Sequence, residues 1–136
     1  MFRAQKLIRF HHCDPAGIVF YPQYFVLMHE LMEDWFSQGL EIDYAEFVRE
    51  RGLGLPMVKL ECEFLAPNPM GDVLTLELAV KRIGNSSLTL SVRGTARGRE
   101  SLRATLTVVH ASIPQMRPVP IPDELRSAME RFRAES

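Results

Sequence analysis

Apolar and polar residues alternate along several stretches of the chain, which is the pattern of strands with one buried face. At the N-terminus the apolar face comprises Phe2, Ala4, Ile8 and Phe10, interrupted only by Lys6 and Leu7. The later stretches are residues 58–64, 73–81, 88–96 and 102–108, with a Gly84-Asn85 turn between the second and the third. The links between successive strands are too short for crossover helices, so neighbouring strands are expected to run antiparallel.

A helical pattern lies between the first strand and the others. Apolar side chains recur at spacings of three and four and form one wide stripe: Tyr24, Leu27, Met28, Leu31, Met32 and Trp35, flanked by Phe25 and Phe36. Pro22 suits the first helical position, where its missing N–H costs no hydrogen bond, and Gly39 suits the end. A short helix is expected over residues 43–51, and a terminal helix is expected to begin near Asp123.

These elements predict an α+β domain, in which a long helix lies on one antiparallel sheet of about five strands. The length of 136 residues is that of a single domain, and we expect residues 1–136 to form it. One helix cannot cover both faces of such a sheet, and the sheet keeps two edges. The pattern therefore predicts a homo-oligomer, with a dimer joined edge to edge.

Composition and charge exclude several classes of protein. Apolar residues make up 46% of the chain and charged residues 24%, which is typical of a globular protein rather than a disordered one. Sixteen Lys and Arg against 17 Asp and Glu exclude the overall charge of a nucleic-acid-binding protein, although a local basic patch for one phosphorylated ligand is compatible with them.

Neither a membrane span nor secretion is expected. The longest apolar run, Tyr24 to Met28, is far shorter than the roughly 20 residues that a membrane helix needs. The N-terminus has charges spread through it and lacks the apolar region of a signal peptide. Two cysteines, Cys13 and Cys62, favour a reducing compartment over a disulfide framework. We therefore expect a cytoplasmic protein.

The segment before the long helix holds the residues best suited to chemistry. Asp14 begins an Asp-Pro-Ala-Gly turn, and seven residues later the helix begins at Tyr21 and Pro22. Helix starts present unpaired N–H groups, and since Pro22 has none, the available donors are those of Tyr21, Gln23 and Tyr24. A carbonyl between the Asp14 carboxylate and the Tyr21 N–H would face a nucleophile or base on one side and an oxyanion donor on the other.

Simpler interpretations of the same segment remain open. Asp14 preceding Pro15 is also the pattern of an Asx turn, and spacing alone favours that structural role. A metal site would need three or four ligands, but strand geometry brings together at most His12 with Asp14, or His11 with Cys13. Cys13 lacks a base on its own face, because His12 points the other way. No metal is therefore expected.

Other recognisable motifs are missing from the sequence. No dinucleotide-binding, P-loop, GxSxG or HExxH motif occurs, so no nucleotide cofactor, lipase-like site or zincin site is expected. His29 lies one turn into the long helix beside its polar edge, where solvent exposure is the simpler interpretation and substrate contact the alternative. We expect no cofactor.

The stretch HCDPAGIVFYPQYF resembles the signature of the 4-hydroxybenzoyl-CoA thioesterase family of hot-dog-fold enzymes. The resemblance covers nearly the whole chain: PMVKLECEFLAPNPMGDVLTLELAVKRIGNSSLTL is similar to the family's central strands, and RPVPIPDELRSAM to its C-terminal end. It implies a hot-dog fold, a long helix wrapped by an antiparallel sheet. It also implies a homodimer with a continuous sheet, paired further into a homotetramer.

The resemblance also implies roles for particular residues. Asp14 matches the catalytic carboxylate, which attacks the thioester carbonyl or activates a water, and the Tyr21 amide matches the donor that polarises this carbonyl. Gly17 falls among the residues that bind substrate. His29 matches an acidic helix residue near the substrate ring, and a neutral histidine could likewise accept a phenol hydroxyl.

Two departures from the family bear on the substrate. A related branch, the Tol–Pal-associated acyl-CoA thioesterases, has a histidine where this chain has Pro22, which places the chain nearer the aryl-CoA branch. The family's basic run at the hairpin, which binds nucleotide phosphates, corresponds here to Gly84-Asn85-Ser86 and lacks arginines. The candidates that remain for phosphate binding are Lys81, Arg82, Arg97 and Arg99, with solvent-exposed surface as an equal alternative for each.

The expected function is therefore that of an acyl-CoA thioesterase. It would hydrolyse an aryl-CoA (4-hydroxybenzoyl- or benzoyl-like) or a short-chain acyl-CoA to the free acid and CoA, with no nucleic-acid partner. A CoA thiol resembles the cysteine thiol, whose pKa is about 8.5, so its thiolate can leave without a strong general acid. The alternatives are a non-catalytic acyl-CoA-binding hot-dog protein and a hot-dog hydratase, although the Asp14 turn is not the hydratase pattern.

Overall fold

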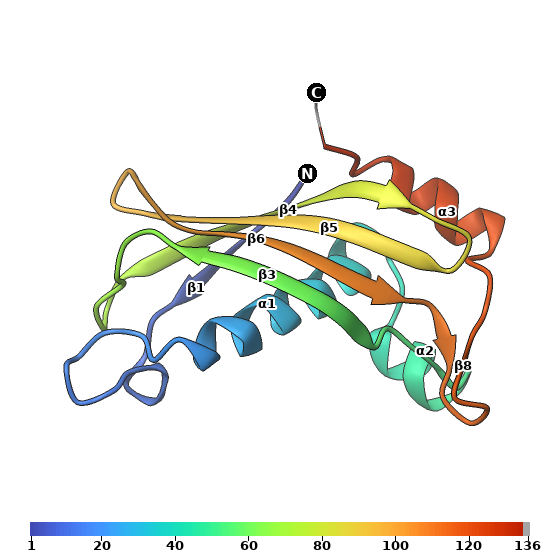
Figure 1. The fold of residues 1–136 in the computed structure, drawn as a ribbon, viewed down its shortest axis with the longest axis horizontal. Coiled ribbons are helices and arrows are strands. Elements are labelled where there is room, and N and C mark those ends of the chain that lie inside the picture. The colour runs from blue at the N-terminus through green and yellow to red at the C-terminus, as the bar shows by residue number, and fades with distance from the viewer. Residues whose placement is uncertain (135–136) are drawn as a thin grey trace.

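The computed structural model describes residues 1–134, and its main feature is one antiparallel sheet with a long helix along its inner face (Figure 1). The five strands lie in the order β1-β4-β5-β6-β3. Their bounds are β1 Phe2–Leu7, β3 Met57–Phe64, β4 Val73–Ile83, β5 Ser87–Ala96 and β6 Arg99–Val109. The α+β class, the antiparallel arrangement and the hot-dog fold expected from the sequence are confirmed.

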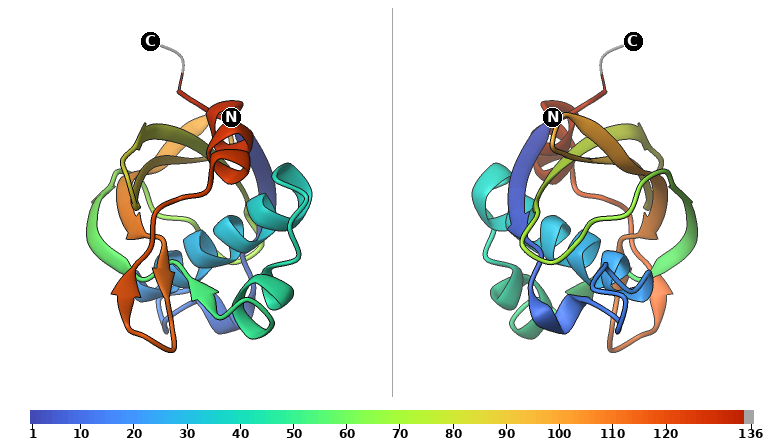
Figure 2. Two further views of the ribbon diagram at one scale, coloured as in Figure 1. Left: turned by 90° about the vertical axis from the view of Figure 1, so that its right-hand side faces the viewer. Right: turned by 90° about the vertical axis from the view of Figure 1, so that its left-hand side faces the viewer.

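The long helix α1 (Pro22–Asp34) continues into a single π-helical turn, η2 (Trp35–Gly39). Pro22 is its first residue and Gly39 its last, as predicted. Viewed from either end, the sheet curves around α1 (Figure 2). The predicted stripe faces this sheet, and its buried members are Tyr24, Leu27, Met28, Leu31, Met32, Trp35 and Phe36. The long helix is therefore the centre of the hydrophobic core.

Shorter elements close the two ends of the molecule. A 3₁₀ turn, η1 (Phe10–His12), connects β1 to the loop before α1 at one end. The other end holds α2 (Tyr44–Arg49), α3 (Asp123–Glu130) and a small second sheet (Figure 1). That sheet consists of β2 Leu53–Gly54, β7 Ala111–Ser112 and β8 Arg117–Pro118. The two ends of the molecule are thus closed by different elements.

The first strand departs from the prediction near its end. It stops at Leu7, and Phe10, which was assigned to the apolar face, is 81% exposed in η1. Lys6 occupies an inward position of β1, where its Nζ lies 2.7 Å from the Asp34 Oδ2 of α1. This partly buried ion pair explains how a lysine fits the apolar face of an edge strand.

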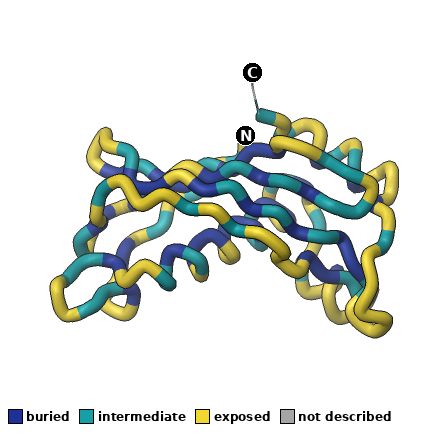
Figure 3. The backbone as a smooth tube through the Cα atoms, in the orientation of Figure 1, coloured by how far each residue is buried: buried dark blue, intermediate teal, exposed yellow. Residues whose placement is uncertain are grey.

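The inner face of the sheet is not covered evenly. Buried positions alternate along β4, β5 and β6 (Figure 3), whereas β3 has no fully buried residue. On the apolar face of β3, Leu60 and Cys62 are half-buried, while Val58 and Phe64 are 63% and 48% exposed. The β3 edge thus presents apolar side chains that α1 covers only in part.

No helix within residues 1–134 combines the length and the apolar character needed to cross a membrane. Cys13 and Cys62 are both free thiols. The cytoplasmic location expected from the cysteine content stays a prediction.

Gly39 allows the π-helical turn to pack closely against the core. A Cβ atom at this position would lie 2.7 Å from Trp35 Cδ1 and 3.0 Å from Phe132 Cζ. Trp35 is fully buried and cannot move without disturbing the core. We therefore expect Gly39→Ala to lower the free energy of unfolding by about 1–3 kcal/mol, measured by denaturant titration.

The matched control is Gln38→Ala, which changes an exposed residue of the same turn. It should leave the free energy of unfolding within about 0.5 kcal/mol of the wild type. Equal stability of Gly39→Ala and Gln38→Ala would contradict the requirement for close approach at Trp35.

Candidate active site

Asp14 lies in the turn between η1 and α1, and its backbone and side chain both close that turn. Its Oδ1 accepts a hydrogen bond from the Ala16 N–H at 2.9 Å, and its carbonyl accepts one from the Gly17 N–H, also at 2.9 Å. Gly17 has a φ of +78°, a conformation that glycine adopts without strain. The Asx turn is therefore real, but it uses a single carboxylate oxygen. Within residues 1–134 the Asp14 Oδ2 accepts no hydrogen bond.

Backbone hydrogen bonds hold this turn to a second loop, residues 65–72. The Met70 N–H donates to the Gly17 carbonyl, and the Val19 N–H donates to the Asn68 carbonyl, both at 3.0 Å. Next to them Ile18 and Pro69 form an antiparallel bridge. Asp14 is thus carried on a loop that is fixed on both sides, which is the condition for a preorganised catalytic group.

The start of α1 leaves one backbone donor free near this turn. The Gln23 N–H donates to Phe20 O at 2.8 Å, and the Tyr24 N–H donates to Tyr21 O at 3.1 Å. The Tyr21 N–H has no acceptor in the described part of the chain. Of the three donors available by sequence, Tyr21 therefore has the one suited to an oxyanion.

A buried polar cluster that the sequence analysis missed supports the site from behind. The Tyr24 hydroxyl donates to Asn68 Oδ1 at 2.7 Å, and Asn68 Nδ2 donates to Ser101 Oγ at 2.9 Å and to Asp72 Oδ2 at 3.3 Å. Arg97 Nε lies 2.7 Å from Asp72 Oδ1, an ion pair whose N–H is not aligned for a hydrogen bond. Burial raises the pKa of Tyr24 to about 12, so this phenol stays a donor.

These contacts join three segments that are distant in the sequence: the first turn of α1, the 65–72 loop and the β5–β6 hairpin. Tyr24, Asn68 and Ser101 are each at most 5% exposed. Asn68 and Asp72 looked like ordinary turn formers beside Pro69 and Gly71. One signal for this cluster was present in the sequence. Tyr24 belongs to an otherwise apolar stripe, and a buried hydroxyl needs a hydrogen-bond partner.

Aromatic rings gather beside the free Tyr21 amide. Tyr21, Tyr24 and Phe25 each contact Phe64 at the end of β3, with ring centroids 5.7–6.4 Å apart. Tyr21, Tyr24 and Phe64 line a hollow of about 280 Å³ that is open to solvent. Phe64 belonged to the predicted strand, but its place beside the helix start could not be derived from the alternating pattern.

The other residues that the resemblance assigned to substrate binding lie at different distances from Asp14. Gly17 lies in the Asp14 turn. His29 is exposed on α1, with its Nε2 3.5 Å from Glu33 Oε2. Lys81 and Arg82 lie toward the end of β4. This strand begins at Val73, directly after the 65–72 loop that bonds to the Asp14 turn. Lys81 follows Val73 by eight residues, which is roughly 27 Å along a strand. Within one protomer these two cations are thus remote from Asp14.

Two arginines lie closer to Asp14. Arg97 and Arg99 flank the tip of the β5–β6 hairpin, at the same end of the molecule as the Asp14 turn (Figure 1). Together with Ile18 they line a hollow of about 510 Å³. They are therefore better placed than Lys81 and Arg82 to hold phosphates in the same protomer. In residues 1–134, no three His, Cys, Asp or Glu side chains form a group that could hold a metal ion.

Comparison with known proteins identifies relatives along most of the chain. A model of the thioesterase-like superfamily matches residues 8–129. A 1,4-dihydroxy-2-naphthoyl-CoA hydrolase from Acaryochloris marina is 28% identical over 130 residues, which cover 93% of this chain and 94% of that protein. A 4-hydroxybenzoyl-CoA thioesterase from a Pseudomonas species is 35% identical over 78 residues, which cover 57% of this chain and 55% of that protein.

A solved structure is also similar. The structure of a gentisyl-coenzyme A thioesterase superposes with a TM-score of 0.85 at 26% identity, covering 92% of this chain and 99% of that one.

A buried histidine, His12, supports the Asp14 turn from the side of η1. It is 6% exposed, its carbonyl accepts the Phe20 N–H at 2.9 Å, and its Nδ1 accepts the Arg9 N–H at 2.8 Å. Burial, and after it the charge of neighbouring His11, lowers the pKa of His12 below 6.5. Protonation would add a hydrogen at one ring nitrogen and remove the acceptor that Arg9 uses.

We therefore expect the folded state to lose stability on the acid side. Above pH 6.5 the ring is neutral in both states, so its contribution is fully present. As the pH falls below 6.5 the unfolded chain binds the proton first, and the free energy of unfolding decreases until the lower folded pKa is passed. Denaturant titrations between about pH 5 and 8 measure this change. His12→Gln should weaken the slope, and an identical slope would assign it to other groups.

Proposed function

The chain belongs to the thioesterase-like superfamily, and we propose that it is an acyl-CoA thioesterase that hydrolyses an aryl-CoA to the free acid and CoA. One observation carries the proposal: within residues 1–134, Asp14 has a carboxylate oxygen that accepts no hydrogen bond and Tyr21 has a backbone N–H without an acceptor, and both occur on one preorganised loop and helix start. The names of the three relatives refer to CoA thioesters of aromatic acids.

The proposed chemistry needs few groups. The thioester carbonyl receives a hydrogen bond from the Tyr21 N–H, which stabilises the oxyanion as it forms; such a donor is typically worth about 10²–10³ in rate. The Asp14 Oδ2 either attacks the carbonyl carbon or removes a proton from the attacking water. In both routes the carbon–sulfur bond breaks and the electron pair leaves on the CoA thiolate. On the first route water then hydrolyses the anhydride formed between the acyl group and Asp14; on the second route the attacking water has already become the second oxygen of the released acid.

An aromatic acyl group suits the walls of this site. Tyr21, Tyr24 and Phe64 offer ring faces and edges beside the proposed oxyanion donor. Aromatic rings pack favourably against one another in offset or edge-to-face geometry. A short aliphatic acyl group would fill the hollow less completely, so the aryl-CoA is the preferred substrate class.

The remaining contacts are proposed for the rest of the substrate. Gly17 would contact it through the backbone beside Asp14, and Arg97 and Arg99 would hold the CoA phosphates, since their guanidinium groups are exposed at the same end. Lys81, Arg82 and His29 could contribute from a second copy of the chain.

That second copy is proposed to pair through β3. Among residues 1–134, β3 pairs with β6 alone, so its other edge has unpaired backbone groups, and Val58 and Phe64 expose apolar side chains along it. Antiparallel pairing of two β3 strands would place the Phe64 end of one copy beside the Met57 end of the other. It would also cover the open hollow at Tyr21, which is incomplete in a single chain. Pairing of such dimers into tetramers stays a prediction.

If two copies pair through β3, a single charged substitution on this strand should disrupt the dimer. We expect the wild-type protein to sediment at twice the monomer mass, or four times if dimers pair. Val58→Glu should shift it toward monomer, because two carboxylates would be buried at the symmetric edge. The control Leu7→Glu changes a 45% exposed residue of β1, the strand at the other edge of the sheet, and should leave the mass unchanged. A wild-type monomer at micromolar concentration would contradict the proposal.

The role of Asp14 is tested by two substitutions that separate charge from turn geometry. Asp14→Asn keeps an oxygen that can accept the Ala16 N–H, so the Asx turn and the melting temperature should persist. It removes the anionic oxygen, so kcat/KM should fall by at least about 10²-fold. Asp14→Ala removes both and should also lower stability by about 1 kcal/mol.

The assay is thiol release from benzoyl-, 4-hydroxybenzoyl-, 1,4-dihydroxy-2-naphthoyl-, short-chain and long-chain acyl-CoA. Fast release from an aryl ester that is lost in Asp14→Asn is the expected result. Undiminished release by Asp14→Asn would reduce Asp14 to a turn residue. Binding of CoA esters by the wild type without any thiol release would favour the non-catalytic acyl-CoA-binding protein.

A further inference from the structure

The arginine hollow, the space beside Arg97 and Arg99, adjoins the proposed acyl site. It has a volume of about 510 Å³, and its walls include Ile18 and Pro67. The same two residues also line the hollow at Tyr21 that would take the acyl group. A long substrate could therefore lie with its acyl group at Tyr21 and extend across Ile18 and Pro67 to the two arginines.

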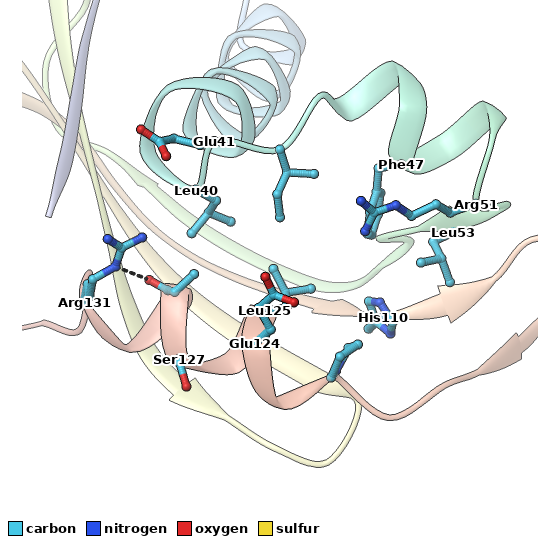
Figure 4. Close-up of a pocket in the computed structure, with 13 residues that line it drawn as sticks. Leu40, Glu41, Phe47, Arg51, Leu53, His110, Glu124, Leu125, Ser127 and Arg131 are labelled. Carbon is cyan, nitrogen blue, oxygen red and sulfur yellow. Dashed lines mark hydrogen bonds between the residues drawn. The ribbon is translucent and has the colours of Figure 1, made fainter.

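The arginine hollow has an excess of positive charge. Arg97 and Arg99 are exposed, and within residues 1–134 Asp72 is the one carboxylate that lines it. A larger cavity of about 610 Å³ lies between α2 and α3 at the other end of the molecule. It has as many anions as cations at its rim: Arg51, Arg131, Glu41 and Glu124 (Figure 4). Of the two cavities, the arginine hollow is therefore the one suited to an anionic ligand.

Asp72 fixes the orientation of Arg97. The Asp72 side chain is 3% exposed, and its Oδ1 lies 2.7 Å from the Arg97 Nε. The Arg97 side chain is itself 73% exposed, and its Nη1 and Nη2 donate no hydrogen bond within residues 1–134. The carboxylate thus holds the guanidinium by its inner edge and leaves two terminal nitrogens free toward solvent. Such a pair of nitrogens can bind a phosphate bidentately.

The Asp72 carboxylate is in turn held by the buried cluster. Asn68 Nδ2 donates to Asp72 Oδ2 at 3.3 Å and to Ser101 Oγ at 2.9 Å. Asn68 is 1% exposed, and its Oδ1 accepts the Tyr24 hydroxyl. The orientation of Arg97 is therefore fixed by the same hydrogen bonds that connect the start of α1 to the 65–72 loop.

Arg97 also has a backbone conformation that is unusual for arginine. Its φ is +54° and that of Gly98 is +70°, and the two form the tip of the β5–β6 hairpin between the paired residues Ala96 and Arg99. Two-residue tips of this kind favour asparagine or aspartate before the glycine, because both residues need a positive φ. An arginine is strained there, and strained residues concentrate at functional sites.

We propose that Asp72 is a positioning residue that holds Arg97 ready for the phosphate groups of the CoA carrier, with Arg99 as the second cation. The inference rests on the proposed thioesterase function and adds a specificity to it: the site selects thioesters of a phosphorylated carrier over those of pantetheine alone. Asp72 does not touch the reacting atoms. It acts through Arg97, because a side chain that is already ordered loses less entropy when the phosphate binds.

The first test is calorimetric titration of the full-length protein with adenosine 3′,5′-bisphosphate, a nucleotide with two phosphates and no thioester. Adenosine is the matched probe without phosphate. We expect saturable binding of the bisphosphate and no binding of adenosine at the same concentrations. The titration involves no hydrolysis, so its result is independent of the thioesterase activity.

Two variants and their combination separate the roles of the pair. Arg97→Asn places a favoured residue at the hairpin tip, so it should raise the melting temperature while it weakens bisphosphate binding at least about tenfold. Asp72→Asn keeps an oxygen for Asn68 but removes the ion pair, so it should weaken binding roughly three- to tenfold, the cost of ordering one flexible side chain. Added to Arg97→Asn, it should cause no further loss, because the residue through which it acts is gone.

A measurement on the wild type keeps the test decisive if Asp72→Asn does not fold. NMR relaxation of the arginine Nε–H groups reports how far each side chain is ordered. We expect the Arg97 Nε–H to be ordered in the free protein and the Arg99 Nε–H to be mobile, with the Arg97 signal assigned by its loss in Arg97→Asn. Equal mobility of the two groups would contradict the positioning role.

Kinetics with thioesters test the specificity. In Asp72→Asn and Arg97→Asn the KM for benzoyl-CoA should rise by the factors given for the bisphosphate, whereas kcat should be retained. The KM for benzoyl-pantetheine, which has no phosphate, should be unchanged in both. The control Arg3→Gln removes one positive charge from the outer face of β1 and should alter neither KM.

Several results would overturn the inference. Absence of saturable bisphosphate binding, or full affinity in Arg97→Asn, would remove the phosphate site. A further loss when Asp72→Asn is added to Arg97→Asn, or an equal rise of KM for benzoyl-pantetheine, would show that Asp72 acts on the fold and not through Arg97. The expected bisphosphate results in a protein that releases no thiol from any ester would refute the proposed function and still support the site.

Discussion

The packing of α1 into the curved sheet is the contact on which the rest of the structure depends. Its apolar stripe supplies the centre of the core, including the fully buried Leu31, Trp35 and Phe36. Burial of this much apolar surface fixes both the axis of the helix and its position along the sheet. The core therefore fixes the positions of both ends of α1. The candidate active site, with the Asp14 turn and the Tyr21 N–H, adjoins the first of these ends.

At the N-terminal end of α1, hydrogen bonds connect the hydrophobic core to the loop of the candidate active site and hold that loop in place. Tyr24 is part of the apolar stripe, yet its hydroxyl reaches Asn68, whose backbone in turn holds Val19. The same helix therefore anchors the loop that carries Asp14 while its first turn presents the Tyr21 amide. Carboxylate and donor are placed relative to one another by the helix, and not by a direct contact between them.

Local patterns predicted much of this arrangement. Spacing located α1, with its start at Pro22 and its end at Gly39, and the turn residues located Asp14. The features that escaped depend on partners far along the chain: Asn68 bonds to Tyr24 44 residues away, and Phe64 reaches the helix start from another strand. A single sequence does not indicate which distant residue will be the partner, even where a buried tyrosine indicates that one is needed. Phe10 was misplaced for a similar reason, because η1 interrupts a face that the alternation alone would continue.

The unpaired Tyr21 amide belongs to the main chain, and this shapes how the protein can change over evolution. Substitution of the tyrosine side chain alters the aromatic wall but leaves the N–H in place, so under the proposed mechanism acyl selectivity could diversify without loss of the oxyanion donor. Only proline at that position, or a chemical exchange of the amide for an ester, would remove the donor itself. The activating dipole is thus inherited with the path of the backbone, while the surrounding rings are free to drift toward new substrates.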